Sequence, residues 1–192
     1  MVNRAQLDAF AKAPPLPLGF KYKPDVITTA EERALVREIE RLPFTAFAFR
    51  GFEGKRRTVS YGWRYDFNKQ KVQQADPIAP FLLPIRALGA AFAGLEPEAL
   101  EQITVIEYSP GSAIGWHKDR PMFGDVVGVS LLSPTLFRFR RKAGTKWERA
   151  SLGVDARSVY LLRGPSRDEW QHSIPPVETL RYSITMRTFR SA

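Results

Sequence analysis

The second half of the chain, from Ile103 onward, is a succession of short runs rich in β-branched and aromatic residues, with no helical pattern between them. These runs predict strands over residues 103–109, 115–119, 126–132, 136–141, 158–162 and 181–189. They are separated by turn residues, which are Pro110-Gly111, Ser133-Pro134, Gly144, Gly164-Pro165 and Pro175-Pro176. Many short strands without intervening helices can bury their apolar faces only against a second sheet or by closing on themselves. We therefore expect a sandwich, a barrel or a jelly roll.

Two helical patterns lie in the first half of the chain. Thr29 and Glu32 have the spacing of a capping box, and apolar residues then recur at helical intervals, so we expect a helix from Ala30 to Leu42. A mostly apolar run rich in Leu, Ala and Phe predicts a second helix that begins near Pro80 and packs on the core. Helices followed by strands indicate an α+β protein.

Between the two helical patterns, residues 44–67 are rich in aromatic and β-branched residues and are punctuated by glycines, which is typical of hairpin-like strands. The sequence shows no internal repeat and nothing that marks a second domain. We therefore expect a single domain over residues 1–192, in which residues 1–100 hold the helices and the hairpin and residues 101–192 form the β core.

The charge of the chain favours an anionic partner. Its 29 lysines and arginines exceed its 20 aspartates and glutamates, which gives a formal net charge of +9. Nucleic acid is the commonest partner of such a surplus, and the alternative is a generally soluble basic protein.

The chain contains no cysteine, which excludes disulfides, thiol catalysis and cysteine-ligated zinc or iron–sulfur sites. A cysteine-free chain is compatible with a reducing cytoplasm. The N-terminus lacks the apolar core of a signal peptide, and no stretch approaches the roughly 18 apolar residues of a membrane span. We expect a soluble, cytoplasmic, monomeric protein without membrane contact.

The two histidines of the chain suggest a metal site. His117 stands two residues before Asp119, and in a strand such side chains project from the same face, so both could bind one ion. The other histidine, His172, lies far enough along the chain to return beside them and supply a third ligand. Two histidines and one carboxylate are the ligands of non-haem Fe(II) oxygenases. Because His-x-Asp also occurs often by chance, a solvated strand end is the alternative.

The last predicted strand has one polar face and one apolar face. One face carries Arg181, Ser183, Thr185 and Arg187, and the other carries Tyr182, Ile184 and Met186. The polar face could simply lie in water. Alternatively it could point into the mouth of a barrel, where two guanidinium groups could bind both carboxylates of a small diacid.

Four strings resemble the AlkB-type Fe(II)/2-oxoglutarate-dependent dioxygenase family in order and spacing, over residues 103–190. They are Y-S-P-G-S-A-I-G-W-H-K-D, F-R-F-R, G-P-S-R-D-E-W-Q-H-S-I and R-Y-S-I-T-M-R. The segment K-R-R-T-V-S-Y-G-W-R-Y-D-F also resembles that family's substrate-side hairpin. The resemblance implies a double-stranded β-helix (jelly-roll) as the catalytic core, with the N-terminal helices packed against it. It further implies that the hairpin within residues 1–100 recognises the nucleotide.

The resemblance also implies a role for individual side chains. His117, Asp119 and His172 would hold Fe(II) and carry the catalysis, with 2-oxoglutarate as cosubstrate and O₂ as oxidant. The residues implied to bind 2-oxoglutarate are Arg181 at its distal carboxylate, Arg187 near its keto-acid end, Tyr108, and Ser183 between the arginines. Ile106 departs from the pattern, because many relatives carry Asn at this position, so one cosubstrate contact differs.

The implied reaction is the oxidative demethylation of N-alkylated nucleobases in DNA, with RNA as the alternative nucleic acid, releasing formaldehyde, succinate and CO₂. A base inside a duplex cannot reach the metal, so it must be flipped out or come from a single strand, and it then needs aromatic and basic contacts. The hairpin residues expected to supply them are Arg57, Tyr61, Trp63 and Tyr65. Ordinary strand packing is the alternative for each of these residues.

Two other functions remain open. The same oxygenase chemistry could act on a protein or a small molecule, or the chain could be a non-catalytic jelly roll that binds nucleic acid. The latter is disfavoured because a binding protein has no need of three metal ligands and two arginines.

Several residues near these motifs are expected to lie outside the site. Trp116 and Lys118 should point away from the metal, and Arg167 should tie down a loop beside it. The basic residues of F-R-F-R-R-K alternate with phenylalanines, so they either line a nucleic-acid groove or form a solvated strand face.

Overall fold

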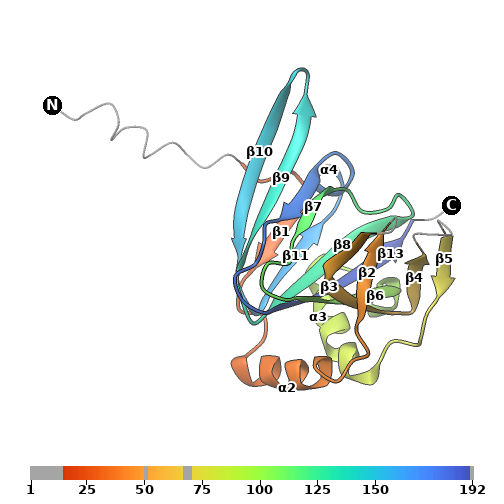
Figure 1. The fold of residues 1–192 in the computed structure, drawn as a ribbon. Coiled ribbons are helices and arrows are strands. Elements are labelled where there is room, and N and C mark those ends of the chain that lie inside the picture. The colour runs from red at the N-terminus through yellow and green to blue at the C-terminus, as the bar shows by residue number, and fades with distance from the viewer. Residues whose placement is uncertain (1–14, 50–51, 67–70, 191–192) are drawn as a thin grey trace.

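The computed structural model describes residues 15–49, 52–66 and 71–190, and their main feature is an antiparallel sheet of seven strands (Figure 1). In order across this larger sheet, the strands are β1 (Phe20–Lys23), β11 (Ser158–Leu162), β8 (Phe123–Leu131), β13 (Arg181–Phe189), β6 (Gln102–Tyr108), β3 (Phe52–Tyr61) and β2 (Thr45–Phe49). Except for β3 and β2, which form a hairpin, neighbours in this order are distant in the sequence, so the sheet forms only when both halves of the chain come together.

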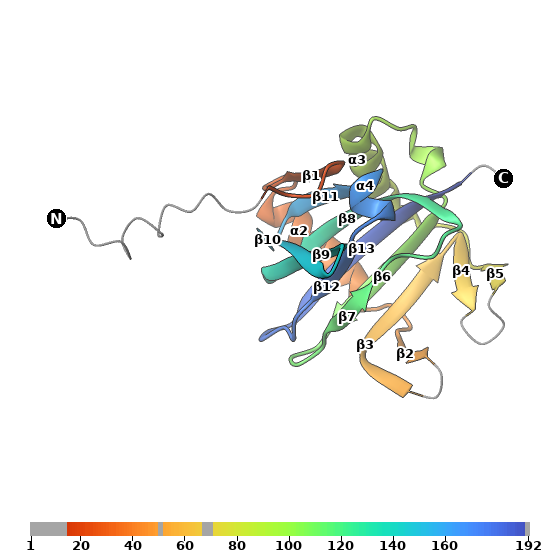
Figure 2. The ribbon, with the colours of Figure 1, turned by 90° about the horizontal axis from the view of Figure 1, so that it is seen from above.

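A smaller antiparallel sheet of four strands lies against the larger one. Its order is β10 (Lys146–Val154), β9 (Thr135–Ala143), β12 (Gln171–Ile174) and β7 (Ile114–His117). The far end of the β9–β10 hairpin extends beyond the rest of the sandwich (Figure 1). A separate two-stranded ribbon joins β4 (Trp63–Asp66) to β5 (Lys71–Gln74) beside the larger sheet (Figure 2).

The two sheets enclose one apolar cluster. Phe137 and Phe139 of the smaller sheet pack there against Ile106, Tyr160 and Leu162 of the larger sheet. Two sheets closed around a shared interior form the double-stranded β-helix expected from the sequence, so the predicted α+β jelly-roll architecture is confirmed.

The helices cover the outer side of the larger sheet (Figure 1). They are α2 (Thr29–Ile39) and α3 (Leu83–Ala93), with the short helices η2 (Pro80–Leu82) before α3 and η3 (Pro97–Ala99) after it. A second apolar cluster joins them to the outward side chains of the strands, including Ile103, Val129 and Ile184. No helix in the described ranges is long and apolar enough to cross a membrane.

The first helix begins one residue earlier than predicted. Thr28, not Thr29, is the N-cap, and it forms the capping box with Glu31. The predicted partner, Glu32, is buried instead and accepts a 2.8 Å hydrogen bond from the backbone N–H of Leu132. The predicted capping box was wrong because Thr28 and Glu31 have the same three-residue spacing as Thr29 and Glu32, so the sequence offers both pairs.

The strand predictions succeed where both faces are packed. The predicted ranges 158–162 and 181–189 coincide with β11 and β13. Strands β1, β5, β10 and β12 lie outside the predicted ranges. Strand β1 alternates aromatic and basic residues over only four positions, which is too short a run to identify a strand. Strand β12 is equally short and does not alternate, and β10 is an edge strand whose side chains are mostly exposed.

Gly128 on β8 provides a test of the packing inside the sandwich. A Cβ atom at this position would lie only 2.1 Å from Cζ of Tyr160, whose ring is itself packed against Phe137 at 5.0 Å between ring centroids. We therefore expect Gly128→Ala to lower the free energy of unfolding by about 1–3 kcal/mol, measured by urea denaturation. Gly153→Ala is the matched control, because no atom lies within 4 Å of its added Cβ. Equal stability of the two variants would contradict the packing.

Candidate metal centre

The pairing of β7 with β12 brings the two histidines together. His117 and His172 are directly opposite each other in the antiparallel register, and their ring centroids are 4.3 Å apart. Behind them, Phe137 stacks on the His172 ring at 5.3 Å and holds its orientation. The histidine pair therefore depends on a backbone register, which a loop could not fix as firmly.

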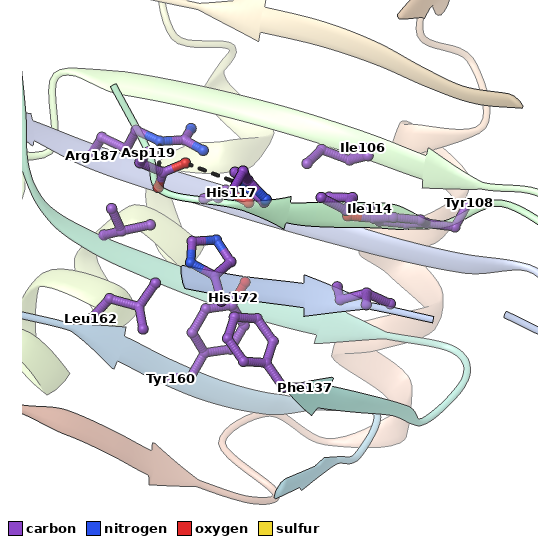
Figure 3. Close-up of a pocket in the computed structure, with 13 residues that line it drawn as sticks. Ile106, Tyr108, Ile114, His117, Asp119, Phe137, Tyr160, Leu162, His172 and Arg187 are labelled. Carbon is purple, nitrogen blue, oxygen red and sulfur yellow. Dashed lines mark hydrogen bonds and ion pairs between the residues drawn. The ribbon is translucent and has the colours of Figure 1, made fainter. Parts of the chain in front are cut away.

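Asp119 completes the group from a loop. The predicted strand 115–119 ends at His117, so the Asp119 side chain reaches the histidines from beyond the end of β7. One ligand atom from each of His117, Asp119 and His172 lies within 4.8 Å of the other two. Figure 3 shows the three side chains converging. The ring of His117 is fixed by a 2.9 Å contact between Nδ1 and the Gly115 carbonyl. Since a carbonyl only accepts, Nδ1 carries the proton and Nε2 is free to bind a metal.

The protonation states of these side chains suit a divalent metal. Burial lowers the pKa of His172 to about 3 and also lowers the pKa of His117. Burial alone would raise the pKa of the Asp119 carboxyl, but nearby positive charge, Arg187 foremost, holds that pKa well below its usual range. At neutral pH the group therefore consists of two neutral imidazoles and one carboxylate, which are ligands that divalent iron accepts.

Two arginines position Asp119 and its loop. Arg187 Nε donates to Asp119 Oδ2 at 3.4 Å, and its Nη1 donates to Gln102 at 2.8 Å. Arg167 is buried and donates to three backbone carbonyls, at residue 120 in the loop after Asp119 and at residues 123 and 124 where β8 begins. The expectation that Arg167 ties down a loop beside the metal agrees with these bonds.

A pocket extends from this group into the interior of the sandwich. Apart from the three candidate ligands, Tyr108, Thr185 and Arg187, its lining is apolar and aromatic: Ile106, Ile114, Val126, Phe137, Tyr160, Leu162 and Ile174. In Figure 3, Arg187 and Asp119 mark one end of the pocket and Tyr108 the other. Such walls keep water away from a bound ligand, and the few polar groups fix its orientation.

Arg181 lies beyond the Tyr108 end of the pocket. The residue is completely buried, and its guanidinium stands 5.0 Å from the centre of the Tyr108 ring. Its Nε donates to Ser130 at 3.2 Å, but neither terminal nitrogen has a hydrogen-bond partner within the described part of the chain. The alternative that this arginine faces water is wrong.

A buried cation with unpaired nitrogens costs several kcal/mol unless an anion joins it. A dicarboxylate that reached from the metal end of the pocket to Arg181 would supply that anion. The side chains present therefore fit the iron and 2-oxoglutarate that the sequence reading expects.

Of the other residues predicted to bind 2-oxoglutarate, Tyr108 lies in the pocket and Ser183 does not. Tyr108 lines the pocket, and burial raises the pKa of its hydroxyl, which keeps the proton available for donation. Ser183 is buried opposite Ser130 on the neighbouring strand and does not line the pocket. Thr185, two residues further along the same face, does line it. The alternation of β13 placed both residues on this face, but it could not show how deep the pocket reaches.

Two of the four predicted substrate residues lie on the wrong side of the larger sheet. Tyr61 is buried in the cluster beneath the helices. Arg57 makes two 2.8 Å hydrogen bonds to Glu107 on the same outer side. The prediction of these two residues as base contacts is therefore wrong, because the alternation of β3 turns them away from the pocket. Arg56, which the alternation turns inward, interacts electrostatically with Tyr108 and His117.

The other two predicted substrate residues lie in the β4–β5 ribbon. Tyr65 stacks under the guanidinium of Arg120, 4.6 Å from its ring centre, so the ribbon touches the loop that carries Asp119. Trp63 packs edge-on against Phe189 at 5.8 Å. Neither residue lines the pocket. Tyr65 contacts the loop at the metal end directly, and Trp63 lies behind Phe189, which packs against Phe123 where that loop ends.

Trp116 and Lys118 point away from the pocket, as expected. The indole of Trp116 contacts Arg138 and Arg140 on the outer face of the smaller sheet. Lys118 donates to the backbone carbonyl of Asp168, in the short helix α4 (Pro165–Asp168), at 2.7 Å.

Comparison with known proteins places this geometry in a family. The model of the 2OG-Fe(II) oxygenase superfamily matches residues 19–188. The chain is 27% identical to the "Alkylated DNA repair protein ALKBH8 homolog" of Arabidopsis thaliana, over 90% of this chain and 56% of that protein. It is 26% identical to human "Alpha-ketoglutarate-dependent dioxygenase alkB homolog 4", over 85% of this chain and 64% of that protein. The chain thus spans between half and two thirds of the length of these relatives.

Solved structures share the fold at low sequence identity. The structure of OsALKBH1 superposes with a TM-score of 0.68 at 15% identity, covering 91% of this chain and 98% of that one. A prolyl-4-hydroxylase from Pseudomonas putida superposes with a TM-score of 0.61 at 16% identity, covering 98% of each chain. The jelly-roll core is common to both.

We expect the metal-free protein to lose stability as the pH falls below about 6.5. The pKa of His172 falls from 6.5 to about 3 on folding, so between these values the unfolded state binds more protons than the folded state. This group should lower the free energy of unfolding by up to about 1.4 kcal/mol for each pH unit within that window. Urea denaturation at several pH values measures the slope. His172→Gln should flatten it, and an unchanged slope would contradict a buried neutral imidazole.

Proposed function

The chain belongs to the 2OG-Fe(II) oxygenase superfamily and matches AlkB homologues in sequence, and from that premise we propose that it is a dioxygenase that demethylates N-alkylated nucleobases. The proposed substrate is alkylated DNA, with RNA as the alternative nucleic acid. The observation that carries the proposal is a His-Asp-His group at one end of a pocket and, beyond Tyr108 at the other end, a buried arginine whose terminal nitrogens have no partner in the described part of the chain.

The side chains of the pocket would divide the work along its length. His117, Asp119 and His172 would hold Fe(II), and Arg187 would keep Asp119 ionised and correctly placed. Arg181 would bind the distal carboxylate of 2-oxoglutarate with its two free nitrogens. Fe(II), 2-oxoglutarate and O₂, when bound, supply the oxidising power, and the products are succinate, CO₂ and, from an N-methyl group, formaldehyde.

Beside the Arg181 cation, tyrosine hydroxyls would donate further hydrogen bonds to the 2-oxoglutarate carboxylate. Burial raises the pKa of Tyr160 to about 12 and also raises the pKa of Tyr108, so both keep their protons at neutral pH. The apolar walls between them and the metal would exclude water from the cosubstrate.

The charge and the surroundings of the pocket support a nucleic-acid substrate. The net charge of +9 favours a polyanion. Trp63 and the stacked pair of Tyr65 and Arg120 stand near the metal end, where an extruded or single-stranded base would enter. Two of the matched relatives carry names that refer to alkylated DNA repair and to tRNA carboxymethyluridine methylation.

The cysteine-free sequence is compatible with the cytoplasm, where we propose that the protein acts.

A turnover assay tests the proposal. Protein supplied with Fe(II), ascorbate and 2-oxoglutarate should release formaldehyde from N-methylated oligonucleotides and none from unmethylated ones. His172→Ala should reduce turnover at least about 100-fold, because it removes a metal ligand. Arg33→Gln, an exposed charge change on α2, is the control and should keep full turnover.

The assay separates the possible errors. Consumption of 2-oxoglutarate without formaldehyde release from methylated DNA or RNA would show that the substrate is a protein or a small molecule. Full turnover by His172→Ala would show that the metal assignment is wrong.

A further inference from the structure

The outer face of the smaller sheet is built differently from the inner face. Along β9 and β10, Phe137, Phe139 and Ala150 point into the sandwich and are buried. The alternate residues point outward, and apart from Leu136, Ser151 and Gly153 they are basic or aromatic. Together with one residue of β7, they form a surface that we name the basic–aromatic face, consisting of Trp116, Arg138, Arg140, Lys142, Trp147 and Arg149.

The cations of this face are interleaved with indoles. The Arg140 guanidinium lies 4.5 Å from the ring centre of Trp116 and 4.4 Å from that of Trp147. Arg138 lies 5.2 Å from the Trp116 ring. Trp147 is 42% exposed, which is unusual for so large an apolar side chain and leaves aromatic surface open for another ring.

The arginines are held in place without being neutralised. Arg138 Nε donates to the hydroxyl of Ser173 at 3.0 Å, and Arg140 Nε donates to the side chain of Gln171 at 2.7 Å. Both partners are uncharged and belong to β12. Within the described ranges, no carboxylate forms an ion pair with Arg138, Arg140, Lys142 or Arg149.

Arg141, on the other face of the same strand, shows the contrast. It forms ion pairs with both Glu148 and Glu169, and it stacks on Trp170. Charge on the inward side of β9 is thus balanced within the protein. The positive charges on the outward side have no such carboxylate partners in the described part of the chain, so this side favours the binding of an anion.

We propose that the basic–aromatic face binds single-stranded nucleic acid. Guanidinium and ammonium groups along β9 and β10 would contact successive phosphates, and the exposed indole would stack on an unpaired base. A duplex keeps its bases stacked inside, so it offers phosphates but no free base to the indole. An acidic peptide would likewise use the cations and leave the indole idle.

The position of the face links it to the metal centre. Trp116 immediately precedes His117 on β7, the strand that ends the smaller sheet. A strand bound across β10, β9 and β12 would therefore continue to the edge where the pocket lies. The face would in this way deliver the substrate strand to the pocket, and this delivery rests on the proposed function. Binding of single-stranded nucleic acid to the face requires neither iron nor a methylated base.

Fluorescence anisotropy with a labelled, unmethylated oligothymidylate and metal-free protein tests the proposal. Trp147→Thr, which suits a strand but cannot stack, should weaken binding at least about fivefold. Arg140→Gln should weaken binding and reduce the slope of log affinity against log salt by about 0.7. Arg33→Gln removes the same charge from α2, on the opposite side of the molecule, and should have little effect. Thermal denaturation of each variant confirms that it is folded.

Each outcome decides the matter. Selective loss of binding in Trp147→Thr and Arg140→Gln supports the proposal. Equal losses in all three variants, or no binding by the wild type, overturn it. If a duplex, inorganic polyphosphate or an acidic peptide competed as well per charge as oligothymidylate, and Trp147→Thr bound normally, the face would recognise charge alone and the proposal would be wrong. Because no turnover is measured, failure here is distinct from failure of the demethylase assay.

Discussion

The antiparallel pairing of β7 with β12 is the constraint on which the site depends. These two short strands place His117 opposite His172, and the same register sends Trp116 to the outer face of the sheet. Asp119 then needs only to fold back from the loop after β7, where Arg167 and Arg187 hold it. Hydrogen bonds of the backbone therefore position two of the three candidate ligands, and arginine side chains position the third.

The second constraint is the burial of Arg181 in the middle of the larger sheet. Its strand, β13, pairs with both β6 and β8, so the guanidinium cannot move to solvent without breaking the sheet. The fold thus accepts the cost of desolvating a cation that its own residues only partly satisfy. Such a cost is understandable when a ligand regularly completes the hydrogen bonds, and it links the stability of the fold to the chemistry of the pocket.

The sequence allowed the strands with two packed faces, the candidate ligands and the polar face of β13 to be predicted, because alternation and the scarcity of histidine leave few possibilities. It misplaced the capping box, since Thr28 and Thr29 offer equal spacing to Glu31 and Glu32. It also misplaced Arg57 and Tyr61, because the direction of β3 relative to the pocket depends on pairing with β6, which no local pattern reveals. Thr185 and Tyr160 were missed as pocket residues for a similar reason, since depth within a sandwich is a property of the assembled sheets.

The central claim is that the pocket is built for a diacid held between a metal and Arg181. Calorimetric titration of Mn(II)-loaded protein with 2-oxoglutarate and with 2-oxobutyrate, which lacks the distal carboxylate, tests it without altering the protein. We predict that 2-oxoglutarate binds at least about 30-fold more tightly, because only it pairs the buried guanidinium. Equal affinities for the two keto acids would contradict the account.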